Sequence, residues 1–125
     1  MEEPRERLVS ILDDDESVRR SVANLLLSVG FAVAVFDSAE SFLQAGRSKG
    51  TRCLVLDLKM PGMDGFDLLA RLRDMGRYIP TVILTAHGDD QVRERAMRAG
   101  AVAFLDKPFV SAELIDVVRS ALRRG

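Results

Sequence analysis

The chain of 125 residues has the length of one ordinary domain, and its 47% hydrophobic and 30% charged residues are typical of a globular protein with its own core. Its 18 Lys and Arg against 19 Asp and Glu give a net charge of −1, so we expect no direct nucleic-acid binding by this domain. A single cysteine excludes an internal disulfide, and no apolar run has the length of a membrane helix or follows a signal-peptide pattern. We therefore expect a cytoplasmic protein that does not contact membranes.

Short apolar runs alternate five times with longer amphipathic stretches along the chain. In chain order they predict a strand at 8–12, a helix through 18–29, a strand at 31–36, a helix through 39–43, a strand at 53–56, a helix over 66–75, a strand at 81–84, a helix through 92–99, a strand at 101–105 and a last helix through 114–122. Strands that alternate with helices form βαβ units. We therefore predict an α/β fold, a parallel sheet with helices on both faces, in one domain over 1–125.

Local signals refine this prediction. Residues 53–56 are too apolar to alternate, which is typical of a central strand covered on both faces. Ser38 has the position of a helix N-cap, and Gly30 and Gly100 are typical helix ends. Cys53 opens the central strand, so we expect a small buried hydrophobe rather than a reactive thiol.

Polar side chains come after most of the predicted strands. Asp13 and Asp14 follow the first strand, and Asp57 follows the third. Thr85 follows the fourth strand, and Lys107 comes two residues after the fifth. Ligands bind beyond the carboxyl ends of the strands in an open parallel sheet. We therefore expect three carboxylates, a hydroxyl and an ammonium group to meet in one place.

Carboxylates gathered this closely repel one another unless a cation lies between them. Asp13, Asp14 and Asp57 offer only hard oxygen ligands, which favour Mg²⁺, with Mn²⁺ as a substitute, over Zn²⁺. A carboxylate beside such an ion is able to attack a phosphoryl group and form an aspartyl phosphate. Lys107 and Thr85 have the chemistry to stabilise the charge on that group. The residues alone thus predict a Mg²⁺-dependent phosphoryl-acceptor site.

Each of these residues also has a simpler structural role open to it. Acidic residues after the first strand can cap a helix, which is the role we expect for Asp15 and Glu16. Asp57 can open a turn, Thr85 can end a strand, and Lys107 can be a solvated surface residue. Their shared position at one edge of the sheet favours a functional site.

Four motifs stand in a fixed order at these strand ends: Asp13-Asp14, Asp57-Leu58-Lys59-Met60-Pro61-Gly62-Met63-Asp64-Gly65, Thr85-Ala86 and Lys107-Pro108-Phe109. With this order and spacing, the chain resembles the receiver domains of two-component response regulators from residue 8 to about 122. The stretches 85–89 and 107–109 most resemble receivers of FixJ-type (NarL/LuxR-class) regulators.

The resemblance implies a flavodoxin-like strand order, 2-1-3-4-5. It makes Asp57 the phosphoacceptor, which takes its phosphoryl group from the phosphohistidine of a sensor histidine kinase. It also implies that Asp13 and Asp14 hold Mg²⁺, Asp14 more directly, together with the Asp57 carboxylate and the backbone carbonyl of Lys59. Lys107 would pair with the phosphoryl oxygens.

The resemblance further implies a switch. Thr85 would rotate toward the phosphoryl group, and Phe104 matches the switch aromatic of the family, although a strand Phe packs in a core by default. The Lys107–Pro108 bond resembles the cis peptide of the family. His87 is a lone histidine, so we expect it to lie at the rim of the site rather than to bind metal.

The expected partners follow from the same resemblance. They are a sensor histidine kinase, a second copy of the chain after phosphorylation, and an output domain or downstream partner on the face of the fourth helix, fifth strand and fifth helix. Such regulators continue into a DNA-binding output domain that regulates transcription, and this chain ends before one. We expect a receiver from a longer protein; the alternative is a stand-alone response regulator. The domain would catalyse its own phosphorylation and slow dephosphorylation without being an enzyme for an external substrate.

Three other classes of protein share parts of this pattern. A phosphatase of the haloacid-dehalogenase type carries Asp-x-Asp after its first strand, which 13–15 match loosely. A flavodoxin-like electron carrier needs a phosphate-binding loop there, and an acidic run would repel the flavin phosphate. A pseudo-receiver would act by protein binding alone, and the complete set of site residues argues against it.

Overall fold

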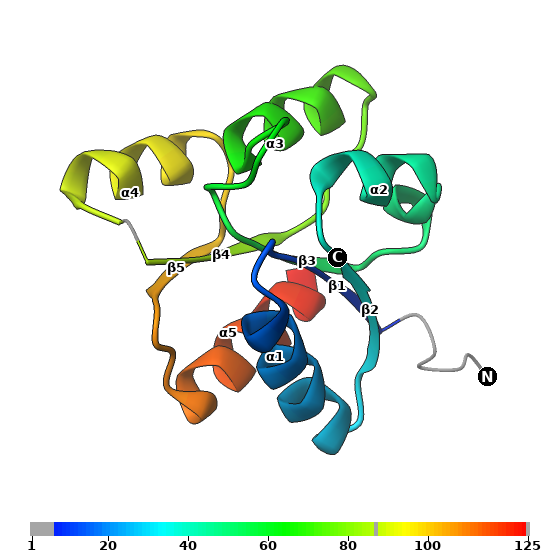
Figure 1. The fold of residues 1–125 in the computed structure, drawn as a ribbon, viewed down its shortest axis with the longest axis vertical. Helices are drawn as coiled ribbons and strands as arrows, with labels where there is room; N and C mark the ends of the chain where they lie inside the picture. Colours follow the sequence, from blue (N-terminus) through cyan, green and yellow to red (C-terminus); the bar gives the residue numbers. More distant parts are fainter. Residues whose placement is uncertain (1–6, 87, 125) are drawn as a thin grey trace.

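The computed structural model describes residues 7–86 and 88–124 and has the predicted α/β architecture (Figure 1). Within these residues no helix combines the length and apolar character needed to cross a membrane. The elements are β1 (Leu8–Leu12), α1 (Glu16–Ser28), β2 (Ala32–Phe36), α2 (Ala39–Gln44), the 3₁₀ turn η2 (Arg47–Lys49), β3 (Cys53–Leu56), α3 (Gly65–Asp74), β4 (Thr81–Thr85), α4 (Asp90–Arg98), β5 (Ala103–Asp106) and α5 (Ser111–Arg124).

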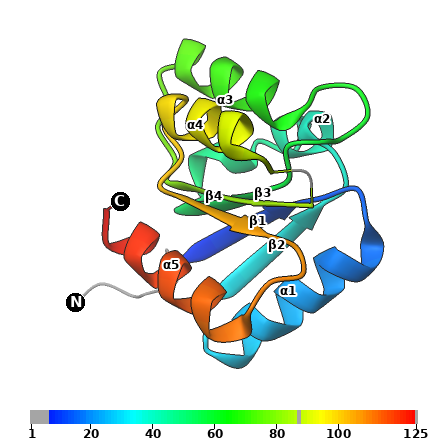
Figure 2. The ribbon, with the colours of Figure 1, turned by 90° about the vertical axis from the view of Figure 1, so that its left-hand side faces the viewer.

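The five strands form one parallel sheet in the order β2-β1-β3-β4-β5, which confirms the predicted order. Helices α1 and α5 cover one face of the sheet, and α2, α3 and α4 cover the other (Figures 1 and 2). From β1 the chain first goes to one side, to β2, and then returns to the other side, to β3. The connections therefore diverge beyond the carboxyl ends of β1 and β3, which is where such sheets bind ligands.

The central strand β3 is buried at all four positions, as its apolar sequence predicted. Leu54 and Leu56 pack into the core beneath α2 and α3. Cys53 and Val55 point to the opposite face and pack with residues of α1 and α5. Burial raises the pKa of the Cys53 thiol to about 12, so the thiol stays protonated and unreactive near neutral pH, in line with its predicted role.

The second strand begins at Ala32, so the predicted start at residue 31 is wrong by one residue. Gly30 has φ +96°, and the amide of the next residue, Phe31, donates a hydrogen bond to the carbonyl of Leu26 in α1. The Phe31 amide thus closes the end of the helix and cannot pair with a neighbouring strand. Its apolar side chain is nevertheless buried, which is why the sequence pattern extended the strand.

The fifth strand shows the same error for the same reason. It begins at Ala103 rather than at Ala101, because Gly100 has φ +106° and the Ala101 amide donates to the carbonyl of Ala96 in α4. It also continues one residue further than predicted, to Asp106. A buried apolar residue after a left-handed helix end therefore belongs to the helix cap and not to the strand.

Two predicted helix caps are confirmed. The Ser38 side chain accepts a hydrogen bond from the amide of Ser41 at 3.0 Å and opens α2. Asp15 opens α1, and its carboxylate accepts from the amides of Ser17 and Val18 at 2.8 and 3.4 Å. Both caps satisfy amides that have no partner inside the helix.

Candidate functional site

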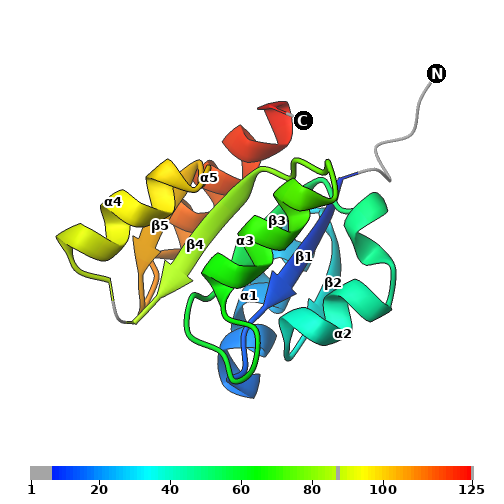
Figure 3. The same cartoon turned by 90° about the horizontal axis from the view of Figure 1, so that it is seen from above.

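The direction of the parallel strands brings the predicted polar residues to one edge of the sheet (Figure 3). Asp13 follows β1, Asp57 follows β3, Thr85 ends β4, and Lys107 follows β5. The first three are buried and Lys107 is half-buried. A buried charged group needs a partner, so their mutual contacts decide what this edge does.

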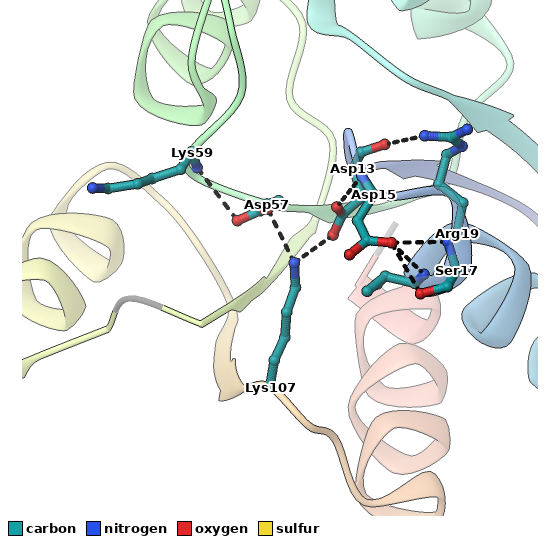
Figure 4. A network of polar contacts seen from close by, with 8 residues as sticks. Asp13, Asp15, Ser17, Arg19, Asp57, Lys59 and Lys107 are labelled. Carbon is teal, nitrogen blue, oxygen red and sulfur yellow. Dashed lines mark hydrogen bonds and ion pairs between the residues drawn. The ribbon is translucent and has the colours of Figure 1, made fainter.

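Lys107 lies between the two buried carboxylates (Figure 4). Its Nζ is 2.8 Å from Asp13 Oδ2 and 3.1 Å from Asp57 Oδ2. The side chains of Asp13 and Asp57 are only 3% and 7% exposed, and that of Lys107 is 16% exposed. The Lys107–Pro108 peptide bond is cis. One ammonium group thus pairs with two carboxylates that are almost fully buried.

The protonation of this cluster follows from burial and charge. Burial raises the pKa of Asp13 above its ordinary value and the neighbouring Asp57 adds to this, while the Lys107 ammonium and the Asp15 amide oppose it. For Lys107, burial alone would lower the pKa, but its hydrogen bonds and attraction to both carboxylates outweigh burial and raise it. The ammonium form of Lys107 therefore persists at neutral pH.

Asp14 completes an acidic cluster at the same edge. Asp13, Asp14 and Asp57 each offer a carboxylate oxygen, and these oxygens lie within 4.8 Å of one another. Asp14 is exposed, whereas the other two are buried. Oxygen ligands at this spacing fit a small hard cation that keeps part of its hydration shell. The three residues therefore have the chemistry and the spacing of a Mg²⁺ site that is open on the side of Asp14.

The loop after β3 wraps closely around Asp57. The Lys59 amide lies 3.3 Å from Asp57 Oδ1 and donates to it, which orients the carboxylate (Figure 4). Gly65 begins α3, and its amide donates to the Leu58 carbonyl at 2.9 Å. A Cβ atom at Gly65 would lie 2.8 Å from the backbone oxygen of Asp57 and 2.9 Å from the Cα atom of Leu58. Only glycine lets α3 begin this close to Asp57.

Two further side chains hold the loops of the site, and the sequence analysis did not identify them. Arg19 donates from Nη1 to the Asp13 carbonyl at 2.8 Å, while the Asp15 amide donates to Asp13 Oδ1 at 2.9 Å. From α2, Glu40 Oε2 accepts the Met63 amide at 2.8 Å. Arg19 comes four residues after the cap at Asp15, so it lies on the same face of the helix, and this spacing could have indicated its contact with the loop of Asp13. Nothing in the sequence pattern links Glu40 to Met63.

The expected switch residues, Thr85 and Phe104, lie on the neighbouring strands β4 and β5. Thr85 is completely buried. Phe104 is buried in the core beneath the helices, and its ring passes so near Gly88 that a Cβ atom there would lie 2.5 Å from it. The Arg93 guanidinium carbon is 5.3 Å from the centre of the same ring. His87, expected at the rim, lies outside the described residues.

Comparison with known proteins gives a consistent assignment. A family model described as the response regulator receiver domain matches residues 9–119. Nodulation protein W of Bradyrhizobium diazoefficiens is 44% identical over 117 residues, which cover 94% of this chain and 52% of that protein. Transcriptional regulatory protein FixJ of Azorhizobium caulinodans is 42% identical over 122 residues, 98% of this chain and 58% of that protein. The chain therefore spans about half the length of these relatives.

Solved structures agree. The crystal structure of FixJ-N has a TM-score of 0.86 at 40% identity, covering 100% of this chain and 98% of that one. The structure of the response regulator StyR also has a TM-score of 0.86, at 46% identity over 94% of this chain and 59% of that one. The relatives include FixJ proteins from three bacteria, in line with the resemblance that the motifs indicated. This chain belongs to the receiver domain family of two-component response regulators.

Proposed function

We propose that Asp57 is the phosphoacceptor of this receiver domain and takes its phosphoryl group from the phosphohistidine of a sensor histidine kinase. The observation that carries this proposal is the placement of the buried Asp57 carboxylate against Lys107 Nζ at 3.1 Å, together with the carboxylates of Asp13 and Asp14 at the carboxyl edge of the sheet. The site thus brings a nucleophile, a cation and hard oxygen ligands close together.

The transfer conserves atoms and charge in one displacement. A carboxylate oxygen of Asp57 attacks phosphorus, the P–N bond to the kinase imidazole breaks, and the imidazole nitrogen keeps the electron pair and takes a proton. The Lys59 amide orients the attacking carboxylate. The Lys107 ammonium, which now contacts Asp57, would stabilise the negative charge on the phosphoryl oxygens. Thr85 has a hydroxyl to donate to those oxygens.

Asp13, Asp14, Asp57 and the Lys59 carbonyl would hold the Mg²⁺ ion, or Mn²⁺ in its place. When bound, the ion supplies positive charge to the phosphoryl oxygens. Lys107 pairs with Asp13 and Asp57, and the exposed Asp14 is the carboxylate that a hydrated ion would meet first.

The same site limits the lifetime of the product. Water that attacks phosphorus breaks the bond to Asp57, releases inorganic phosphate and regenerates the carboxylate. We infer self-phosphorylation and slow dephosphorylation at Asp57 rather than turnover of a separate substrate, because the nucleophile and the phosphoryl-binding groups belong to the same chain. The proposed role of His87, which lies outside the described residues, is to influence the access of water.

The test is the mass of the intact protein after incubation with acetyl phosphate, with and without Mg²⁺, for the wild type and Asp57→Asn. We expect a phosphoryl adduct that needs Mg²⁺ and is absent in Asp57→Asn, because the amide nitrogen and oxygen are poor nucleophiles. Asp57→Asn keeps the shape of the side chain, so loss of the adduct reports on the carboxylate and not on the fold. An adduct that persists in Asp57→Asn, or no adduct in folded wild type, would contradict the proposal.

Thr85 and Phe104 are proposed as the switch that reads phosphorylation. A phosphoryl group adds negative charge at Asp57, which would draw Thr85 and Lys107 inward. The space beside β4 would then admit the Phe104 ring, which now packs against Gly88 and beneath Arg93. The resulting change would alter the face of α4, β5 and α5.

The Phe104 ring can be followed directly by ¹⁹F NMR with fluorinated phenylalanine at this position. We expect its resonance to shift when beryllofluoride and Mg²⁺ are added, because the ring leaves its contact with Gly88. In Asp57→Asn the shift should disappear. An unchanged resonance in the beryllofluoride-bound wild type would remove the switch role of Phe104.

The relatives include proteins described as transcriptional regulatory proteins, and this chain covers about half of their length. We therefore propose that the receiver controls transcription through a DNA-binding output domain and forms a homodimer after phosphorylation. The face of α4, β5 and α5 is the proposed surface for the second copy or for the output domain. A stand-alone regulator is the alternative. We place the domain in the cytoplasm, where sensor kinases carry their phosphohistidine.

A further inference from the structure

Three adjoining hollows lie at the amino edge of the sheet, opposite the phosphoryl-acceptor site. The first, of about 390 Å³, lies where α3 and α4 end, and the second, of about 290 Å³, lies before β3 and β4. The third, of about 330 Å³, lies where the chain enters β1 and α5 ends. Arg77 lines the first two and Arg52 lines the last two, so the hollows form a continuous row. Figure 3 shows this edge at the end of the sheet where the strand arrows begin.

The row is strongly basic. The described residues that line the three hollows include eight cationic side chains and no acidic one. We call these eight residues the basic edge: Arg7, Lys49, Arg52, Arg73, Arg77, Arg98, Arg119 and Arg123. The whole chain has a net charge of −1, so the fold gathers positive side chains at this edge although the chain as a whole is nearly neutral. Such a separation creates a positive field along one edge of the molecule.

Little within the domain neutralises this charge. Arg98 forms an ion pair with Glu94 at 3.8 Å, but both side chains are exposed, so the pair is weak. Over 7–86 and 88–124, none of the other seven side chains forms an ion pair with a carboxylate. The Nε atom of Arg77 is buried and has no hydrogen-bond partner. Because that atom is closed to solvent, it offers no contact to a ligand in the hollows, and the exposed cations are the groups that a ligand would meet.

Helix dipoles account for only part of the basic edge. Arg73, Arg98 and Arg123 lie in the last turns of α3, α4 and α5, where a cation stabilises the helix. Arg7 and Arg52 instead stand directly before β1 and β3. The Arg7 guanidinium carbon lies 5.0 Å from the centre of the Phe31 ring, a cation–π contact within the domain, whereas Arg52 stands at no helix end. The row therefore points to a ligand as well as to helix stability.

Against the expectation from net charge that this domain binds no nucleic acid, we propose that the basic edge binds the sugar–phosphate backbone of duplex DNA without sequence preference. The cations extend through three hollows rather than around a single one, which matches a linear array of phosphates better than a lone anion. Tyr78 lines two of the hollows and is 65% exposed, so its hydroxyl can donate to a phosphate oxygen. The choice of DNA among polyanions rests on the transcriptional role proposed above, but the contact requires no phosphorylation of Asp57.

The test is fluorescence anisotropy of a labelled duplex of arbitrary sequence, titrated with the unphosphorylated 125-residue chain between about 20 and 200 mM NaCl. The test variant is Arg119→Gln with Arg123→Gln, both exposed on α5. The matched control is Arg20→Gln with Arg93→Gln, which removes the same charge from exposed positions in the first halves of α1 and α4, outside the hollows. Circular dichroism and thermal unfolding establish that both variants fold.

We expect wild type to bind with an affinity that falls with salt by about 0.9 logarithmic units per contacted phosphate for each tenfold rise in salt. The test variant should bind more weakly and show a salt slope smaller by about two, whereas the control variant should keep the wild-type slope. Absence of binding at low salt, or an equal loss in both variants, would overturn the proposal. So would stoichiometric displacement of the duplex by inorganic pyrophosphate, because that would indicate a discrete anion site. Failure here would leave phosphorylation of Asp57 intact, since the adduct in the mass measurement is independent of DNA.

Discussion

Replacing Lys107 with methionine is expected to weaken the folded domain in the absence of divalent cations and to slow phosphorylation. Methionine keeps much of the side-chain length but leaves the buried carboxylates of Asp13 and Asp57 facing each other without the ammonium group that now joins them. Breaking one side of a buried ion pair costs about 3–5 kcal/mol, and the open side of this site reduces the expected loss to about 1–3 kcal/mol. Loss of one charge-stabilising donor should slow phosphoryl transfer about 100-fold or more.

The measurement is urea unfolding of Lys107→Met with EDTA and with Mg²⁺, alongside acetyl phosphate labelling. Because Mg²⁺ supplies the missing positive charge, the stability gap to wild type should narrow when the ion is added. Arg20→Met is the control, since Arg20 forms an exposed ion pair with Glu16 at 2.7 Å and should change stability by less than about 1 kcal/mol. Equal stability of Lys107→Met and wild type in EDTA would show that the pairing of Lys107 contributes nothing to the fold.

Replacing Gly65 with alanine is expected to destabilise the domain by about 1–3 kcal/mol and to move the phosphoacceptor loop. The added Cβ atom would meet the backbone oxygen of Asp57 at 2.8 Å, and backbone atoms cannot rotate away as a flexible side chain can. Either α3 shifts outward or the Asp57 backbone is displaced. Both changes alter the position of the carboxylate relative to Lys107, so phosphorylation should slow as well.

Gly50→Ala is the matched control for this prediction. A Cβ atom at Gly50 meets only Leu8 Cδ2, at 4.0 Å, which is an ordinary contact. Its backbone has φ −96°, a conformation open to alanine. Thermal unfolding of both variants should therefore separate the steric effect from the general effect of losing a glycine. If Gly65→Ala unfolds at the same temperature as Gly50→Ala, the added Cβ atom does not clash with the Asp57 backbone and the prediction is wrong.

The alternation of apolar and amphipathic segments was sufficient to predict every strand and α-helix of this fold. The strand starts at 31 and 101 were wrong because a hydrophobic pattern reports burial and not hydrogen bonding. Phe31 and Ala101 are buried, yet their amides close α1 and α4 after left-handed glycines. The 3₁₀ turn η2 was not predicted, since three residues are too few to show a helical period.

The convergence of Asp13, Asp57 and Lys107 could also be predicted, because parallel strands end at a common edge whatever the side-chain details. The partners that hold those residues could not. The contact between Glu40 and Met63 joins helix α2 to the loop before α3, which is far away in the sequence, and only the packed structure shows it. The basic edge could not be predicted either, because the net charge of the chain does not say where in the fold the charged side chains lie.

The measurement that tests the central claim most directly is reductive trapping of the phosphorylated chain. After incubation with acetyl phosphate and Mg²⁺, sodium borohydride reduces an aspartyl phosphate to homoserine, and peptide mass spectrometry then identifies the modified residue. We predict homoserine at Asp57 only, in an amount that depends on Mg²⁺ and follows the intact-mass adduct. Homoserine at Asp13 or Asp14, or an adduct without any homoserine, would contradict the account of Asp57 as the phosphoacceptor.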